Sequence, residues 1–183
     1  MSNTPAIPDE QPGDLMMWVL IVSELLVFGA GLAAFMAMRI TDPAGFAEAQ
    51  SHLHRTAAGI NTVILVTSGF FATQAVRMAK IGQAMRTRGL LLAAILLGLV
   101  FLGVKGMEFS GLASQGITTE THSFYTFYYL LTGFHAAHVL AGILILLLVG
   151  WKAEHHTVEV GTAFWHMVDL VWVLLFPVIY LLS

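Results

Sequence analysis

Two histidines stand three residues apart in LLTGFHAAHVLAG, residues 130–142, inside an apolar run long enough to cross a membrane. At this spacing His135 and His138 share one face of a helix. A second pair, His166 and Asp169, has the same spacing near the end of the chain. Neutral imidazoles bind iron or copper, and a haem takes one or two axial histidines. Imidazoles also carry protons or form hydrogen bonds to neighbouring helices. Metal or haem ligation, proton transfer and hydrogen bonding between helices are therefore all possible for these residues.

Other ionisable residues lie in the apolar runs. A charge at the bilayer centre costs about 2.5–3.5 kcal/mol on insertion scales, so each one needs a partner or a task. Glu24 is either a proton-handling carboxyl or an acid that bonds a neighbouring helix. Asn61 lies on a stripe of small residues, which is typical of close helix packing. Lys105 and Glu108 are one turn apart, which permits an ion pair near the outer end of a span, where long side chains can reach the interface.

A metal site between the last two apolar runs is possible in principle, with His135, His138, His166 and Asp169 as ligands. However, His-x-x-His on a helix is a weak signal, and the chain has no Glu-x-x-His pair of the kind found in di-iron bundles. The absence of cysteine excludes disulfides and thiolate metal sites. Hydrogen bonding between helices is therefore favoured over cofactor ligation.

These residues must be positioned by helices in a membrane. Of the 183 residues, 57% are hydrophobic and 10% are charged, whereas a soluble domain has about 25% charged residues. The composition predicts an all-α polytopic membrane protein, a bundle of five transmembrane helices, with one domain at 14–183 after a tail at 1–13. Asp14 is the expected N-cap of the first helix. Nothing suggests nucleic-acid binding. The expected spans are 14–39, 57–80, 88–110, 123–151 and 162–182.

The basic residues set the expected orientation, since cytoplasmic loops carry an excess of Lys and Arg. One side of the predicted membrane has only Arg39 and Arg55. We therefore expect a cytoplasmic N-terminus and a periplasmic C-terminus in a bacterial inner membrane. The basic residues of the expected cytoplasmic side are Arg77, Lys80, Arg86, Arg88 and Lys152.

Several stretches together resemble the cytochrome c oxidase subunit III family. In that family, a helix with TGxHxxHVxxG precedes a last helix with WHxxDxVW. Nearly the whole chain, from about residue 12 to 183, takes part in the resemblance. The matching stretches are IVSELLVF (21–28), INTVILVTSG (60–69), FLGVKGMEF (101–109), FYTFYYLLTGFHAAHVLAG (124–142) and FWHMVDLVWVLLFPVIY (164–180).

The resemblance implies an accessory subunit without catalytic, cofactor-binding or metal-ligating residues of its own. Haem and copper then belong to a catalytic partner subunit. It also implies bound phospholipid and a role in assembly, stability or proton uptake, and it puts Glu24 at the carboxyl that reacts with carbodiimides in oxidases. The buried polar framework that it carries over is Glu24, Asn61, Glu108, His135, His138, His166 and Asp169.

The resemblance is to a short form of the family. The seven-helix oxidase subunit has two further N-terminal helices, so the lipid cleft that they form should be absent or altered here. Five-helix forms occur in quinol oxidases and beside nitric oxide reductases. The opening PGDLMMW, with Lys105 and Glu108, most resembles the type associated with nitric oxide reductase.

Two alternatives stay open. The first is a membrane redox protein that binds haem b through His166 and either His135 or His138. The second is a small proton-conducting transporter that uses Glu24.

Overall fold

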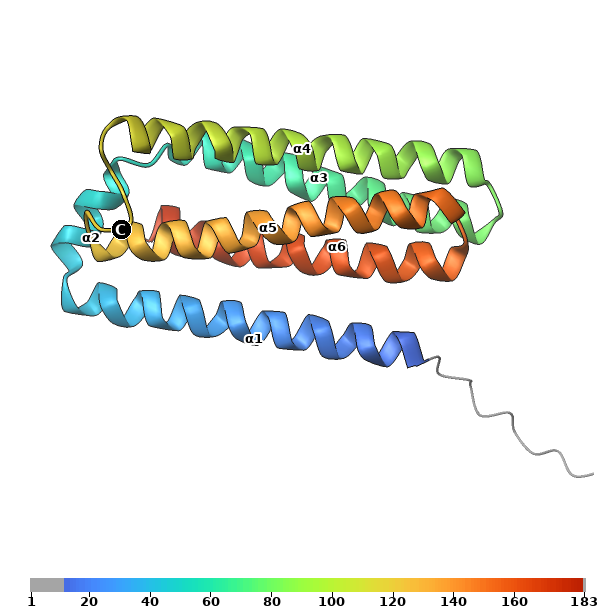
Figure 1. Ribbon diagram of the computed structural model, residues 1–183, viewed down its shortest axis with the longest axis horizontal. Helices are drawn as coiled ribbons and strands as arrows, with labels where there is room; N and C mark the ends of the chain where they lie inside the picture. Colours follow the sequence, from blue (N-terminus) through green and yellow to red (C-terminus); the bar gives the residue numbers. More distant parts are fainter. Residues whose placement is uncertain (1–11, 183) are drawn as a thin grey trace, which may run out of the picture.

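The computed structural model describes the backbone of residues 12–182 and the side chains from residue 15 onward. This part of the chain is helical throughout, with short connections. Figure 1 shows the later long helices side by side, with the first long helix along one flank. The elements are α1 (Pro12–Thr41), α2 (Pro43–Ser51), α3 (Arg55–Lys80), α4 (Ala84–Ser114), α5 (Ser123–Lys152), α6 (His155–Phe176) and a π-helix, η1 (Pro177–Leu181).

The prediction of an all-α bundle with five membrane spans is confirmed. Among the described residues, five helices are long and apolar enough to cross a membrane. The last helix begins at His155 rather than at the expected residue 162, because the polar residues after α5 already form its first turns. The first helix begins at Pro12, so Asp14 lies within it rather than before it. The side chain of Asp14 and most of the predicted tail lie outside the described residues.

The short helix α2 was not predicted from the sequence. Its start has a recognisable signal, because Asp42 is the N-cap and Pro43 occupies the first turn. The Asp42 carboxylate accepts a hydrogen bond from the Gly45 amide at 3.1 Å. Phe46 and Gln50 of this helix are buried, so α2 closes one end of the bundle.

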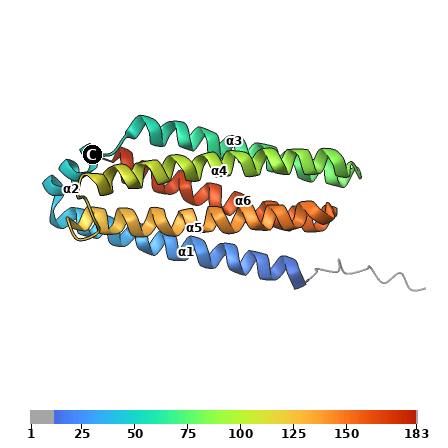
Figure 2. The same ribbon diagram turned by 45° about the horizontal axis from the view of Figure 1, so that its top comes forward.

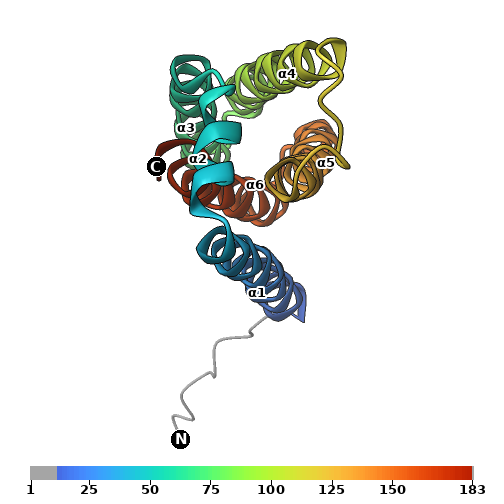
Figure 3. The same ribbon diagram turned by 90° about the vertical axis from the view of Figure 1, so that its left-hand side faces the viewer.

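Helix α6 is the central element of the fold. It packs against α1, α3 and α5, whereas α1 lies outside the arrangement formed by α3–α6, as the end-on view in Figure 3 shows. Helix α1 is accordingly the least buried of the five long helices. The polar residues of α6 therefore face several neighbouring helices.

Trp165 of α6 fills the space between α4 and α5. A Cβ atom at Gly98 or at Gly142 would lie 2.7 Å from the indole ring, so both positions require glycine for this close approach. The indole N–H donates to Ser68 Oγ at 3.0 Å, and that hydroxyl donates to the Ala94 carbonyl at 2.9 Å. One tryptophan thus connects α6 to α3 and, through Ser68, to α4.

The last turns of the chain lie beside α2, at one end of the bundle, as Figure 2 shows. The helix changes from α to π at Pro177, which has no N–H to donate. Gln50 Nε2 donates to the Ile179 carbonyl at 2.8 Å, and the Arg39 guanidinium donates to the Leu182 carbonyl. These bonds attach η1 to α1 and α2.

Candidate functional site

A lysine lies at the centre of a polar cluster formed by α4, α5 and η1. Lys105 Nζ donates to Glu108 Oε2 at 2.7 Å, to Tyr180 OH at 2.8 Å and to Tyr128 OH at 3.1 Å. Tyr180 in turn donates to the Glu108 carboxylate at 3.0 Å. Every hydrogen of the ammonium group therefore has an acceptor.

This cluster confirms the predicted ion pair and corrects its expected setting. The side chains of Lys105 and Glu108 are only 4% and 9% exposed, so the lysine does not extend to the interface. The rings of Phe109, Tyr128 and Tyr180 surround the ammonium group, with centroids 4.9–5.4 Å from Nζ. Hydroxyls from α5 and η1 replace the water that a lysine at the interface would contact.

His135 is fully buried, but its contacts are aromatic. Its ring stacks on Trp172 at a centroid distance of 5.2 Å and meets the edge of Phe101 at 5.6 Å. Among the described residues, neither ring nitrogen has a hydrogen-bond partner. The hydrogen bond between helices that the sequence favoured is therefore not found at this position, and packing of the ring takes its place.

His138 instead points from α5 towards α1. Its Nδ1 lies 2.8 Å from the Phe134 carbonyl, which can only accept, so Nδ1 carries a hydrogen. Its Nε2 lies 3.1 Å from Glu24 Oε2, within ion-pair distance but without the alignment of a directed hydrogen bond. The contact joins α5 to α1.

The second pair, His166 and Asp169, lies on α6 where this helix packs against α3. Thr73 Oγ1 donates to the Gly69 carbonyl at 3.1 Å and therefore accepts from His166 Nε2 at 3.0 Å. His166 Nδ1 lies 3.8 Å from Asp169 Oδ2. Asp169 is buried directly over Gly69, where any Cβ atom would collide with its carboxylate. Because Gly69 has no side chain, α3 leaves room for the carboxylate of Asp169.

His166 departs from the expected buried framework, because its side chain is 45% exposed on this chain. Asn61 is fully buried, and its Nδ2 donates to the Phe101 carbonyl of α4 at 3.2 Å. The structure thus places the framework residues in separate contacts between pairs of helices. Within residues 12–182, no group of three or more His, Cys, Asp or Glu side chains could hold a metal ion.

A further polar contact, missed from the sequence, joins two helix starts. Phe124 N–H donates to His122 Nδ1 at 3.1 Å, so this nitrogen is an acceptor and caps α5. The opposite nitrogen, Nε2, therefore carries the hydrogen that it donates to Asp42 Oδ2 at 3.0 Å. This bond, with that from Gly45, holds the pKa of the Asp42 carboxyl below its usual 3.8. Of these two helix caps, the one on α2 has a recognisable sequence signal, the Asp-Pro pair at residues 42–43.

Comparison with known proteins points to one family. The family model described as cytochrome c oxidase subunit III matches residues 11–183. The cytochrome c oxidase subunit 3 of Synechocystis is 31% identical, over 98% of this chain and 83% of that protein. The subunit of the same name from Thermostichus vulcanus is 33% identical over 92% and 87%, and that of Corynebacterium diphtheriae is 33% identical over 90% and 86%.

Proposed function

This chain belongs to the cytochrome c oxidase subunit III family, and from that membership we propose that it packs beside the haem-containing catalytic subunit of a respiratory complex as a non-catalytic accessory subunit. The predicted family resemblance is thereby confirmed. We further propose that the chain lies in a bacterial inner membrane, with its N-terminus cytoplasmic and its C-terminus periplasmic. The distribution of Lys and Arg supports this orientation.

The observation that supports the proposal is that polar side chains connect neighbouring helices. Lys105 bonds groups on α4, α5 and η1, and Trp165 connects α6 with α3. Asn61 joins α3 to α4. These contacts stabilise the arrangement of the helices, which is what a subunit that supports a neighbouring protein requires.

We propose two finer roles. The chain retains phospholipid, which the mainly apolar groove between α1 and α6 supports. It also assists proton uptake by the complex through Glu24, whose Oε2 lies 3.1 Å from the imidazole Nε2 of His138. A proton-conducting function of the chain alone predicts proton flux in liposomes that Glu24→Gln abolishes.

The partner complex is either a haem–copper oxidase or a nitric oxide reductase. The names of the curated relatives favour an oxidase. The opening PGDLMMW and the Lys105–Glu108 pair support the type associated with nitric oxide reductase. The activity of the co-purified complex, measured with oxygen and with nitric oxide, distinguishes the two.

A mild-detergent pull-down of the full chain, with an absorption spectrum of the eluate, tests the accessory role. We expect co-purification of a much larger haem protein. A chain that elutes alone from membranes containing the complex would contradict the proposal. The alternative of haem b ligation has no specific support, because His138 contacts α1, His166 contacts α3 and His135 is enclosed by aromatic rings.

A further inference from the structure

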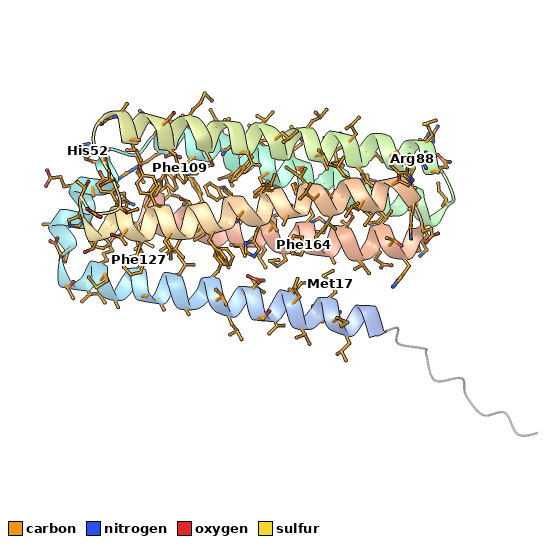
Figure 4. All side chains as sticks on the ribbon, in the orientation of Figure 1. Met17, His52, Arg88, Phe109, Phe127 and Phe164 are labelled. Atoms are coloured by element: carbon orange, nitrogen blue, oxygen red, sulfur yellow. The ribbon has the colours of Figure 1, made fainter. Side chains whose placement is uncertain are left out.

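A small cavity lies at the end of α4, beside the connection between α2 and α3. Its volume of about 70 Å³ exceeds the roughly 10–15 Å³ that one water molecule requires. Its exposed rim includes His52, His54 and Gln115, and Figure 4 labels His52 at this end of the bundle. Deeper in the wall, Leu112 is buried and the side chain of Glu108 is only 9% exposed. The cavity therefore leads from the surface to the carboxylate of Glu108.

The lining of this cavity offers several polar partners to water. The imidazoles of His52 and His54 form no hydrogen bond with another side chain or carbonyl of residues 12–182. Gln115 Nε2 donates to the Gly111 carbonyl at 3.2 Å, and its amide oxygen remains an acceptor. A water molecule inside a protein needs about two to four polar partners, and these groups supply them. The cavity is thus polar enough to be hydrated.

The carboxylate of Glu108 can accept further hydrogen bonds from such water. Lys105 Nζ donates to Oε2 at 2.7 Å, and the one hydroxyl hydrogen of Tyr180 is shared between Oε1 and Oε2, at 3.1 and 3.0 Å. An ionised carboxylate has about four acceptor positions, so two donors do not saturate it. Aromatic rings with centroids 4.9–5.4 Å from Nζ surround the ammonium group of Lys105. Water therefore approaches the buried cluster past Glu108 rather than past Lys105.

We propose that Glu108 is a proton-binding site that exchanges protons, through water in this cavity, with the aqueous phase at the α2 end of the bundle. That end is periplasmic in the orientation proposed above. On uptake, a hydronium ion in the cavity transfers its proton to a carboxylate oxygen of Glu108 and remains as water, and release is the reverse. The net charge of the buried cluster thus changes by one with the pH on that side.

This site is separate from Glu24, which contacts His138 on α5. The surroundings of Glu108 come from its own helix, from α5 and η1, and from the connection across the cavity. The charged or titratable groups there are Lys105, Tyr128, Tyr129, Tyr180, His52 and His54. Of these groups, the two histidines line the cavity together with Glu108, so they are the ones that incoming water meets first.

The test is infrared difference spectroscopy of the full chain in mild detergent after a rapid fall in pH. The carboxyl band that is absent from Glu108→Gln belongs to Glu108. Because the chain has no cysteine, Gly111→Cys places a single thiol on the cavity wall, and N-ethylmaleimide then fills the cavity of a protein that has already folded. We expect this label to slow the protonation of Glu108 about tenfold or more, because entry then requires local opening.

The matched control is Gly103→Cys with the same reagent. A Cβ atom at either glycine would meet no neighbouring atom within 4 Å, but Gly103 does not line the cavity. If the reagent does not reach the thiol at residue 111, Gly111→Leu fills the same space and is compared with Gly103→Leu.

The proposal is supported if filling the cavity slows the rise of the Glu108 band without changing its final amplitude, while the control at residue 103 keeps the wild-type rate. It is overturned if the band rises equally fast with the cavity filled, or if the control slows it as much. It is also overturned if the band appears only as tryptophan fluorescence reports loss of the fold, or does not appear at all.

Discussion

Replacing Lys105 by methionine removes the ammonium group while keeping much of the side-chain volume. The change deletes three hydrogen bonds, of 2.7, 2.8 and 3.1 Å. It leaves the Glu108 carboxylate, 9% exposed, with Tyr180 as its remaining bonded partner. Breaking a buried ion pair from one side costs about 3–5 kcal/mol, so we expect Lys105→Met to lower the free energy of unfolding by about that amount.

The double variant Lys105→Met/Glu108→Gln distinguishes the contribution of the ion pair to stability from that of the surrounding packing. Glutamine keeps an oxygen for the Tyr180 hydroxyl but carries no charge, so the uncompensated carboxylate is removed. We expect the double variant to recover about 2 kcal/mol relative to Lys105→Met, since residues in one network show interaction energies of about 0.5–3 kcal/mol. Lys152→Met, at an exposed position, is the control and should stay within about 0.5 kcal/mol of wild type.

The assay is unfolding of the full chain in mild detergent by added SDS, followed through the fluorescence of its 4 tryptophans. The midpoint and the slope give the free energy of unfolding. If Lys105→Met were as stable as Lys152→Met, the cluster would not stabilise the fold. If the effects of Lys105→Met and Glu108→Gln, each measured alone, add up to that of the double variant, the ammonium and the carboxylate act independently.

Three further changes test other contacts. Gly69→Ala should destabilise the fold by about 1–3 kcal/mol, as overpacking does, because its methyl group would collide with the Asp169 carboxylate; SDS titration measures it. Ser68→Ala leaves a buried indole N–H without its acceptor and should cost about 1–3 kcal/mol by the same titration. The bond from His122 lowers the pKa of Asp42. The stability that this bond contributes is therefore present above pH about 4 and is lost as the pH falls through the lowered pKa. Thermal midpoints should fall more steeply on acidification in wild type than in Asp42→Asn.

Each of these changes has a contradicting outcome. A Cβ atom at Gly103 would meet no neighbouring atom within 4 Å, so Gly103→Ala is the control for Gly69→Ala. Equal stability of the two alanine variants would show that the helices at residue 69 can separate without cost. Ser68→Ala with wild-type stability would remove the role given to its hydroxyl. Parallel pH profiles for wild type and Asp42→Asn would show that the carboxylate does not couple to folding.

The membrane spans could be predicted from the sequence because apolar length alone determines them. The pair of Lys105 and Glu108 was predictable for a similar reason, since one helical turn separates them. Its burial was not, because the hydroxyls that solvate the ammonium group come from Tyr128 and Tyr180, far away in the chain. Local spacing shows which side chains share a helix face but not what the next helix brings to them.

The histidines show the same limit. His135 and His138 lie one turn apart, yet the first packs on aromatic rings and the second contacts α1. The spacing of His166 and Asp169 predicted that both side chains share a helix face but not the exposure of the imidazole, which depends on the groove between α1 and α6. The bond between Asp42 and His122 joins residues 80 positions apart, and only the folded arrangement of α2 and α5 brings them together.

The most direct measurement of how this chain uses its buried polar groups is an absorption spectrum of the full chain, expressed with haem supplied and purified apart from any partner. If these side chains serve helix packing, we expect no Soret band and no bound iron or copper by elemental analysis. A stoichiometric Soret band that disappears in His166→Ala would contradict this and place a redox centre on the chain itself.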